Sequence, residues 1–505
     1  MRHERSVGPI ARRGIPTAGM VILLQGFLCL ATLPGGAAAE AGQAPEGNTV
    51  MRTGMSARRP NILWLVSEDN DTFLGCYGDP LAHTPTLDRL ASQGVLFERC
   101  FAQPVCAPSR FALITGMHSV TCGPAEHMRA QGKIPSWLKG FPAYLRKAGY
   151  YTSNNAKTDY NSPINMKEAW DASNGNAHWR KRPDPQQPFF SVFNHEVTHE
   201  SCLFPGVESK LDFPPMDPAR VRIPPYQPDT PELPYVQRLT YQFQARGYQS
   251  WAREAAAGGL TPATAQFWGE KPTEELYDMV ADPDNVHNLV SDPVHLGALE
   301  QMCAEMKRRV LAYKDNGFIP EGSPLEGYEA SRAPGAVPFE RVVDLANLAS
   351  ERRAENLPKL SAALDDSNEA VRWWGALGCA MLRNQAAPAE AGLRKRLEDP
   401  SGAVQAAAAE ALAHLGHADL ALPVLERWIT DTSGTFYTVH AANVLIRLGE
   451  AGRPLLPVMK KMYSATKDAA MNTAPYYLNR LLERNIGLLE GREPALVYPR
   501  FEGGK

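Results

Sequence analysis

A sequence repeat with a period of 33 residues fills the C-terminal third of this chain. Residues 364–371 recur as residues 397–404, and Leu412 recurs as Leu445. Each copy joins a turn that contains Asp to a helix with Ala and Leu on one face. Because such a unit cannot bury its apolar face alone, stacked copies share a continuous core. The repeat therefore predicts an all-α solenoid over residues 340–490.

The repeated segment resembles HEAT-type repeats, which implies a surface for a protein partner. A plain helical bundle is the structural alternative, since both architectures need amphipathic helices of this kind. Residues 317–339 contain several Pro and Gly residues and are predicted to be a linker in front of the repeats.

Continuous apolar runs alternate with helical patterns in the first half of the chain. Residues 61–66, 95–101 and 189–193 are predicted strands, and residues 86–94 and 141–149 are predicted helices. Runs without polar alternation are typical of strands buried on both faces of a parallel sheet. Alternating strands and helices predict an α/β fold with a mostly parallel sheet, whose carboxyl-end edge carries the functional side chains.

Residues 1–39 have the pattern of a secretory signal. Arg12 and Arg13 precede the apolar run 20–33, and a stretch of small residues ends at Ala39. This order predicts cleavage after Ala39 and a secreted or periplasmic protein. An uncleaved membrane anchor is the alternative, although the run is short for a span. Residues 40–58 are predicted to be a flexible leader, and no membrane span is expected after signal cleavage.

Charge and cysteine content exclude several classes of partner. The formal net charge is -3, so the chain has no electrostatic footprint for nucleic acid. An anionic substrate must therefore meet a local basic site. The 8 cysteines are scattered without CxxC pairs, which argues against a zinc module or a disulfide-stapled small domain.

Residues 104–110 carry the most informative motif, Pro-Val-Cys-Ala-Pro-Ser-Arg. Cys106 is followed by Pro108 and Arg110, and this spacing resembles the maturation signal of type I sulfatases. The resemblance implies that a maturation enzyme oxidises Cys106 to formylglycine. When hydrated, this residue carries two hydroxyls on one carbon: one attacks sulfur, and the other later collapses to release sulfate. A chance match to the motif is the alternative.

The sequence upstream extends the resemblance. Glu68 and Asp69 follow the first predicted strand, where the family has paired Asp residues, and residues 74–78 and 84–97 follow in the family's order. The resemblance implies that Glu68, Asp69 and the formylglycine at Cys106 bind Ca²⁺ or Mg²⁺, because these cations prefer oxygen ligands. Two solvated acidic residues in a loop are the alternative.

Four further side chains occupy positions that the resemblance assigns to the substrate or the nucleophile. Lys157 and His199 would hold sulfate oxygens, and His199 would also protonate the leaving alcohol. Arg110 would steady the formylglycine oxygen by a charged hydrogen bond. His127 would line the mouth of the site. The alternative is that all four are ordinary packed or solvated residues, and Ala156 departs from the family's glycine before the lysine.

A block that normally lies in the middle of the family's enzymes has no counterpart here. The resemblance covers residues 59–233 and 234–316, the latter through a C-terminal signature at 274–289. Between these parts the family has Asp-His-Gly or Asp-Asn, which supply the remaining metal ligands, and then a second active-site lysine. No such motif occurs where Leu233 meets Pro234. We therefore expect a deletion at this join that removes core strands.

The sequence as a whole predicts an incomplete alkaline-phosphatase-like α/β sheet, a small C-terminal α+β subdomain and an all-α HEAT-like solenoid. The function implied by the resemblance is removal of sulfate from a sulfated carbohydrate or another sulfate ester or sulfamate, impaired by the missing block. The alternatives are a phosphoester or phosphonate hydrolase of the same superfamily, and a non-catalytic protein that binds anions or a partner. Fold alone does not choose among them.

Overall fold

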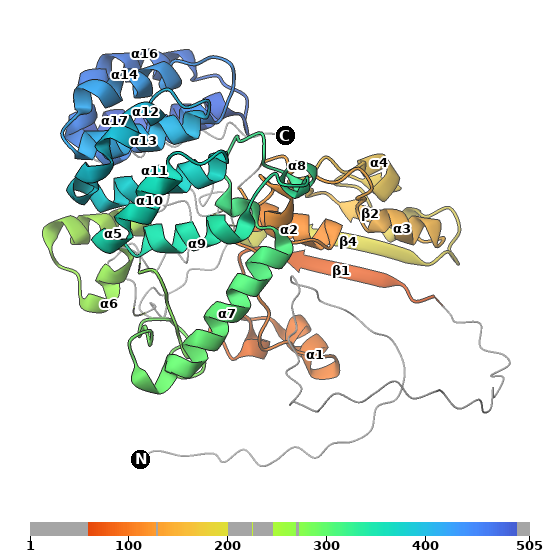
Figure 1. Ribbon diagram of the computed structural model, residues 1–505. Coiled ribbons are helices and arrows are strands. Elements are labelled where there is room, and N and C mark those ends of the chain that lie inside the picture. The colour runs from red at the N-terminus through yellow and green to blue at the C-terminus, as the bar shows by residue number, and fades with distance from the viewer. Residues whose placement is uncertain are drawn as a thin grey trace, which may run out of the picture. The chain divides into compact units, whose positions relative to one another are not determined.

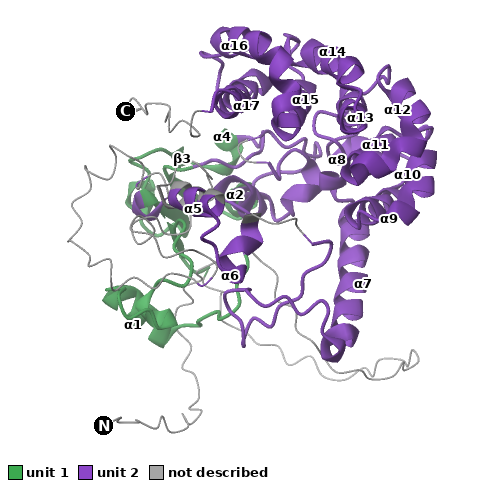
Figure 2. Cartoon of the chain, turned by 90° about the vertical axis from the view of Figure 1, so that its left-hand side faces the viewer, with its two compact units in different colours: residues 1–101, 141–157, 166–196 green, residues 102–140, 158–165, 197–505 purple. Residues whose placement is uncertain are grey.

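The computed structural model describes residues 59–127, 130–199, 246–268 and 272–491, together with the single positions 202 and 225. The predicted signal and leader and the join of Leu233 to Pro234 lie outside these residues. The chain forms two compact units (Figure 2), of which the first takes residues 1–101, 141–157 and 166–196 and the second takes the rest. The domain boundaries derived from the sequence stay predictions.

The first unit is built on a four-stranded parallel sheet (Figure 1). Its strands, in the spatial order β1-β4-β2-β3, are β1 (Ile62–Ser67), β2 (Tyr151–Asn155), β3 (Ala172–Ser173) and β4 (Phe189–His195). Parallel strands need crossover connections. The helices of this unit are α1 (Pro85–Gln93), α3 (Pro142–Lys147) and α4 (Met166–Ala169). The parallel sheet and the strands predicted at residues 61–66 and 189–193 are confirmed.

Phe190 of β4 is the centre of the core in the first unit. Its side chain is fully buried, and three aromatic rings surround it. The ring centroid of Trp64 lies 5.0 Å away, that of Phe141 lies 5.1 Å away and that of Trp170 lies 5.7 Å away. Trp64 lies in β1, Phe141 directly precedes α3 and Trp170 directly follows α4. Phe190 therefore packs both helices against the sheet.

The strand predicted at residues 95–101 is wrong. These residues form no strand, and the side chains of Val95, Phe97 and Phe101 are 76%, 46% and 64% exposed. A strand needs a neighbour that accepts its backbone hydrogen bonds. β1 pairs with β4, and no other described strand pairs with it. Leu65 of β1 is also 36% exposed, although a strand buried on both faces was predicted.

The described residues of the second unit form helices, turns and loops, without a strand. The first part contains α2 (Cys106–Thr115), α5 (Arg246–Ala257), α6 (Pro262–Ala265), α7 (Leu296–Tyr313) and α8 (Tyr328–Arg332). The described residues of the predicted α+β subdomain, within 246–316, form helices and turns and contain no strand. In the described part of the chain, no helix has the length and apolar character needed to cross a bilayer.

The predicted solenoid is confirmed as a stack of helices with one continuous core (Figure 1). Its helices are α9 (Phe339–Ser350), α10 (Leu357–Ala363), α11 (Glu369–Leu382), α12 (Glu390–Arg396), α13 (Gly402–His414), α14 (Ala418–Ile429), α15 (Tyr437–Leu448), α16 (Leu456–Ala465) and α17 (Ala474–Leu489). Leu412 and Leu445, which are equivalent in the repeat, are both buried in this core. The period in the sequence therefore marks equivalent packing positions.

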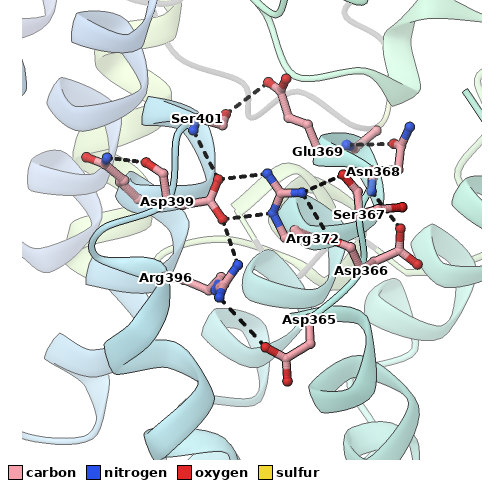
Figure 3. Close-up of polar contacts among 11 residues, drawn as sticks. Asp365, Asp366, Ser367, Asn368, Glu369, Arg372, Arg396, Asp399 and Ser401 are labelled. Carbon is pink, nitrogen blue, oxygen red and sulfur yellow. Dashed lines mark hydrogen bonds and ion pairs between the residues drawn. The ribbon is translucent and has the colours of Figure 1, made fainter. Parts of the chain in front are cut away.

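A buried ion pair joins two successive repeats (Figure 3). The Arg372 guanidinium donates to both carboxylate oxygens of Asp399, at 2.8 and 2.9 Å. The Asp399 side chain is fully buried and also accepts a hydrogen bond from Ser401 N, at 3.0 Å. Arg372 donates in addition to the carbonyls of Asp366 and Ser367. Both charges are therefore fully paired, which a buried pair requires.

Residues 317–339, predicted as a linker, pack against the elements on both sides of them. Tyr328 N donates to Lys133 O at 2.9 Å, on the side of the α2 region. On the side of the solenoid, His440 Nε2 donates to Glu321 O at 3.0 Å. The segment is therefore a structured connection within the second unit.

Several carboxyl groups are buried around this connection. Burial, together with the nearby charge of Glu326, raises the pKa of Glu126 to about 8. Burial also raises the pKa of Glu321 to about 7. Glu326 is paired with Lys133 at 3.0 Å, whereas Glu126 Oε2 is buried with no hydrogen-bond partner among the described residues. Such groups favour their neutral form in the folded chain.

The buried ion pair gives a prediction for stability. Asp399→Ala leaves the Arg372 charge buried and unpaired, so the free energy of unfolding should fall by about 3–5 kcal/mol. Urea unfolding followed by the helical circular dichroism signal measures this change. Asp365→Ala is the matched control, because Asp365 is 64% exposed and meets Arg396 at 3.7 Å. The control should cost at most about 1 kcal/mol, and equal losses would contradict the prediction.

The buried carboxyl groups give a prediction for pH dependence. Their folded pKa values lie above 4.5, so the unfolded chain releases protons that the folded chain keeps. Stability should therefore fall as the pH rises from about 4.5 to about 8, by up to roughly 1.4 kcal/mol per pH unit for each group. Glu126→Gln should flatten this slope in urea unfolding across the pH range. Glu355→Gln, at a 71% exposed side chain, is the control and should leave the slope unchanged.

Candidate active site

Glu68 lies at the carboxyl end of β1, where the parallel sheet gathers polar side chains. Its side chain is 6% exposed and forms an ion pair with Lys157 Nζ, which follows β2. The same ammonium lies 3.6 Å from Glu196 Oε1, directly after β4. Because the strands are parallel, all three ends meet at one edge of the sheet. The structure thus brings together Glu68 and Lys157, which the sequence singled out.

Glu196 is a residue that the sequence analysis missed. The available signal was its position, since it is the first residue after β4 in the same way that Glu68 is the first after β1. Its side chain is 54% exposed, so it adds a solvated negative charge beside Lys157. The ammonium therefore faces two carboxylates in the first unit.

A pair of asparagines fixes the backbone that carries Lys157. Asn154 is fully buried in β2, and its Nδ2 donates to Lys157 O at 3.1 Å. Asn194 of β4 donates to Asn154 Oδ1 at 3.1 Å and to Asn155 O at 2.9 Å. These bonds satisfy the buried polar groups and hold the turn after β2. The hydrogen bonds of the two asparagines therefore fix the backbone position of Lys157.

The two carboxylates predicted as metal ligands in the first unit fit a hard divalent cation in type but make up only part of a full ligand set. Glu68 and Asp69 offer the oxygen ligands that Ca²⁺ and Mg²⁺ prefer. Asp69 has a left-handed backbone with φ of 53°, which turns the chain immediately after Glu68. Ca²⁺ generally takes about six to eight oxygen ligands. Two adjacent carboxylates, one of them paired with Lys157, supply a minority of such a set.

Cys106 is the first residue of helix α2 in the second unit. Val105 precedes it with φ of 57°, and Pro108 occupies the first turn, where a missing N–H leaves no intrahelical bond unmade. Ser109 Oγ donates to Gln103 O at 2.7 Å and to Val105 O at 2.9 Å. Pro108 and Ser109 therefore stabilise the turn at the start of α2, from which the Cys106 side chain projects.

Two polar side chains lie close to the Cys106 sulfur within the second unit, and a third, Arg110, holds the adjoining loop. Cys106 Sγ donates to Asp159 Oδ2 at 3.4 Å. A ring nitrogen of His199 lies within 4.8 Å of the same sulfur, and the His199 side chain is buried. Arg110 is 6% exposed and donates through Nε to Thr158 O at 2.8 Å. The structure thus brings Cys106 and His199 together, with Arg110 beside the adjoining loop.

His127 lies among carboxyl groups. Its Nε2 is 4.0 Å from Glu126 Oε1, and its Nδ1 is 4.0 Å from Glu321 Oε1. Burial lowers the pKa of His127, and the nearby Glu326 opposes that effect. The role of His127 at the mouth of the site stays a prediction.

Comparison with known proteins identifies two parts of the chain. A sulfatase family model matches residues 60–288, and a HEAT-repeat family model matches residues 357–446. An ulvan-active sulfatase of Formosa agariphila is 46% identical over 163 residues, which cover 29% of this chain and 26% of that protein. Iduronate 2-sulfatase of Mus musculus is 38% identical over 98 residues, covering 19% of this chain and 18% of that protein.

A third relative supports the same assignment. N-acetylgalactosamine-6-sulfatase of Homo sapiens is 41% identical over 103 residues, covering 18% of this chain and 20% of that protein. The chain therefore spans about a quarter or less of the length of these curated relatives. The matches agree with the motif around Cys106 and with the repeat period in the C-terminal third. The chain combines a sulfatase-family domain, over residues 60–288, with HEAT repeats over residues 357–446.

Proposed function

We propose that this chain is by descent a sulfuric ester hydrolase that acts through formylglycine at Cys106. The observation that carries the proposal is the position of Cys106 in the first turn of α2, with Asp159 at 3.4 Å and the buried His199 within 4.8 Å. A nucleophile needs neighbours that can accept and donate protons. Formylglycine would supply a geminal hydroxyl nucleophile, in place of the thiol.

The side chains around Cys106 have roles that follow from their chemistry. His199 carries a ring nitrogen close to the nucleophile and would protonate the leaving alcohol. Arg110 is a permanent cation and would steady an oxygen at position 106. Lys157 would hold a sulfate oxygen, and Glu68 and Asp69 would hold Ca²⁺ or Mg²⁺ together with the side chain at position 106. The cation would lower the cost of negative charge that develops on the sulfate.

The proposed substrate is a glycan-type sulfate ester or sulfamate. The support is the names of the relatives, which refer to ulvan, iduronate and N-acetylgalactosamine. The pattern in residues 1–39 supports secretion or periplasmic location. The HEAT repeats would bind a protein partner, because stacked helices present an extended surface.

We also propose that the activity of this chain is impaired. The family's second metal-ligand block and second lysine have no counterpart in the sequence. Among the described strands, β1 pairs with β4 alone, which agrees with the loss of a neighbouring strand. Losing one preorganised electrostatic contact typically costs about 10² to 10³ in rate. A non-catalytic protein that binds anions or a partner is the second candidate. The Lys157–Glu68 ion pair agrees with a loss of catalysis, because it engages the ammonium that would hold the sulfate.

The first prediction for this function concerns maturation. Coexpression with a formylglycine-generating enzyme should convert Cys106, because the motif from Cys106 to Arg110 is complete. Trypsin should release residues 100–110 as one peptide, which contains Cys100 as an internal control. Tandem mass spectrometry should locate an aldehyde at position 106 and an alkylated thiol at position 100. An unmodified thiol at 106, with the maturation enzyme active on another substrate, would contradict the prediction.

The second prediction concerns turnover. The matured chain should hydrolyse an aryl sulfate at least about 10²-fold more slowly than a complete relative, because ligands for the cation are absent. Inserting the central block of a complete relative between Leu233 and Pro234 should restore the rate. Cys106→Ala in the restored protein should then abolish it. The ratio of aryl sulfate to aryl phosphate hydrolysis separates sulfatase from phosphoester hydrolase, and an ordinary rate in the unrestored chain would refute the proposed impairment.

A further inference from the structure

Asp159 contacts the nucleophile position, and the function proposed so far gives it no specific task. Its Oδ2 accepts a hydrogen bond from Cys106 Sγ at 3.4 Å, within the second unit. The residue lies two positions after Lys157, in a stretch where only the lysine was assigned. We propose that Asp159 is a positioning residue that binds the hydrated form of the formylglycine side chain at position 106. This inference rests on the proposed conversion of Cys106.

The backbone on the N-terminal side of Asp159 is fixed by Arg110. Arg110 Nε donates to Thr158 O at 2.8 Å, and the guanidinium lies 5.6 Å from the ring centroid of Tyr160. Tyr160 is itself 8% exposed. One buried arginine therefore holds the residues on both sides of Asp159 against helix α2, the same helix that carries Cys106.

The backbone on the C-terminal side is fixed by Asn161. Asn161 Nδ2 donates to Ala125 O at 3.0 Å and to His127 O at 2.6 Å. Asn161 O accepts a hydrogen bond from Gly132 N at 2.9 Å. Asp159 and Asn161 both have φ of 45°, a left-handed conformation that Asp and Asn tolerate better than most residues. The carboxylate is therefore carried by a short loop anchored at both ends.

The hydrogen-bonding chemistry of the Asp159 carboxylate determines whether it would bind the aldehyde or the hydrate at position 106. An ionised carboxylate only accepts hydrogen bonds. An aldehyde at position 106 has no O–H to donate, whereas its hydrate has two hydroxyls on the same carbon. Hydration adds one water across the C=O bond and changes no oxidation state. Since a charge-assisted hydrogen bond is made with the hydrate alone, Asp159 shifts the equilibrium from aldehyde to hydrate. The hydrate is the form that carries the attacking hydroxyl.

The Cys106 sulfur marks the place where this bond would form. Sγ and a formylglycine oxygen are both attached to the β-carbon of residue 106. An oxygen there would keep the direction toward Asp159 Oδ2, because the anchored loop and helix α2 do not depend on the identity of that atom. A carbon–oxygen bond is shorter than a carbon–sulfur bond, and a second hydroxyl on the same carbon gives the carboxylate a choice of donor.

The experiment measures the aldehyde directly and does not need sulfatase activity. Matured wild-type chain reacts with an aminooxy probe, which forms an oxime with the aldehyde but not with the hydrate. The native wild type should react slowly. Asp159→Asn keeps the shape and the tolerance of positive φ but loses the charge, and Asp159→Ala loses the acceptor. We expect the native oxime rate to rise about tenfold or more in Asp159→Ala, with a smaller rise in Asp159→Asn.

Two controls separate this role from a structural one. In denaturant, all variants should form the oxime at the same rate, because the contact exists in the fold alone. Asn161→Ala loosens the anchored loop and keeps the carboxylate, so its native rate should rise less than that of Asp159→Ala. Equal native rates in wild type and Asp159→Ala, or an equal rise in Asn161→Ala, would overturn the inference. Failure of Cys106 to mature would overturn the proposed function as well, and aryl sulfate assays on the same samples report on that function independently.

Discussion

The pairing of β4 between β1 and β2 determines what the first unit can do. All three strands run in the same direction, so their carboxyl ends must lie at one edge of the sheet. Glu68, Lys157 and Glu196 come from segments far apart in sequence, and they meet because each follows one of these strands. Phe190 maintains this arrangement from inside, through aromatic contacts with β1, α3 and α4.

The second unit positions its chemistry through hydrogen bonds from side chains to the backbone. The turn before α2 is fixed by Pro108 and Ser109, and the loop around Asp159 is fixed by Arg110 and Asn161. No long-range sheet register is needed for these contacts. The solenoid depends on contacts between neighbouring repeats, because each repeat packs on the next and is joined to it by pairs such as Arg372 and Asp399.

The features that the sequence predicted correctly depend on patterns over short stretches of the chain. The repeat period, the apolar runs of β1 and β4, and the motif around Cys106 are all visible within a few tens of residues. The strand at residues 95–101 failed because pairing depends on a partner strand, which apolar character does not reveal. Asp159 and Glu196 were missed because an isolated acidic residue has no pattern, and their importance comes from what lies next to them in space. The packed connection at 317–339 was missed because Pro and Gly occur in ordered turns as well as in linkers.

The roles proposed for Glu68 and Lys157 are coupled, because each is the buried counter-charge of the other. Breaking a buried pair so that one charge is left alone costs about 3–5 kcal/mol. In the proposed function a cation at Glu68 and a sulfate at Lys157 each supply the replacement charge. If the cation is held poorly, Glu68 keeps Lys157, and the sulfate loses its partner as well. In the proposed function, a loss of metal ligands would therefore weaken substrate binding and transition-state stabilisation together, even with Glu68 and Lys157 in place.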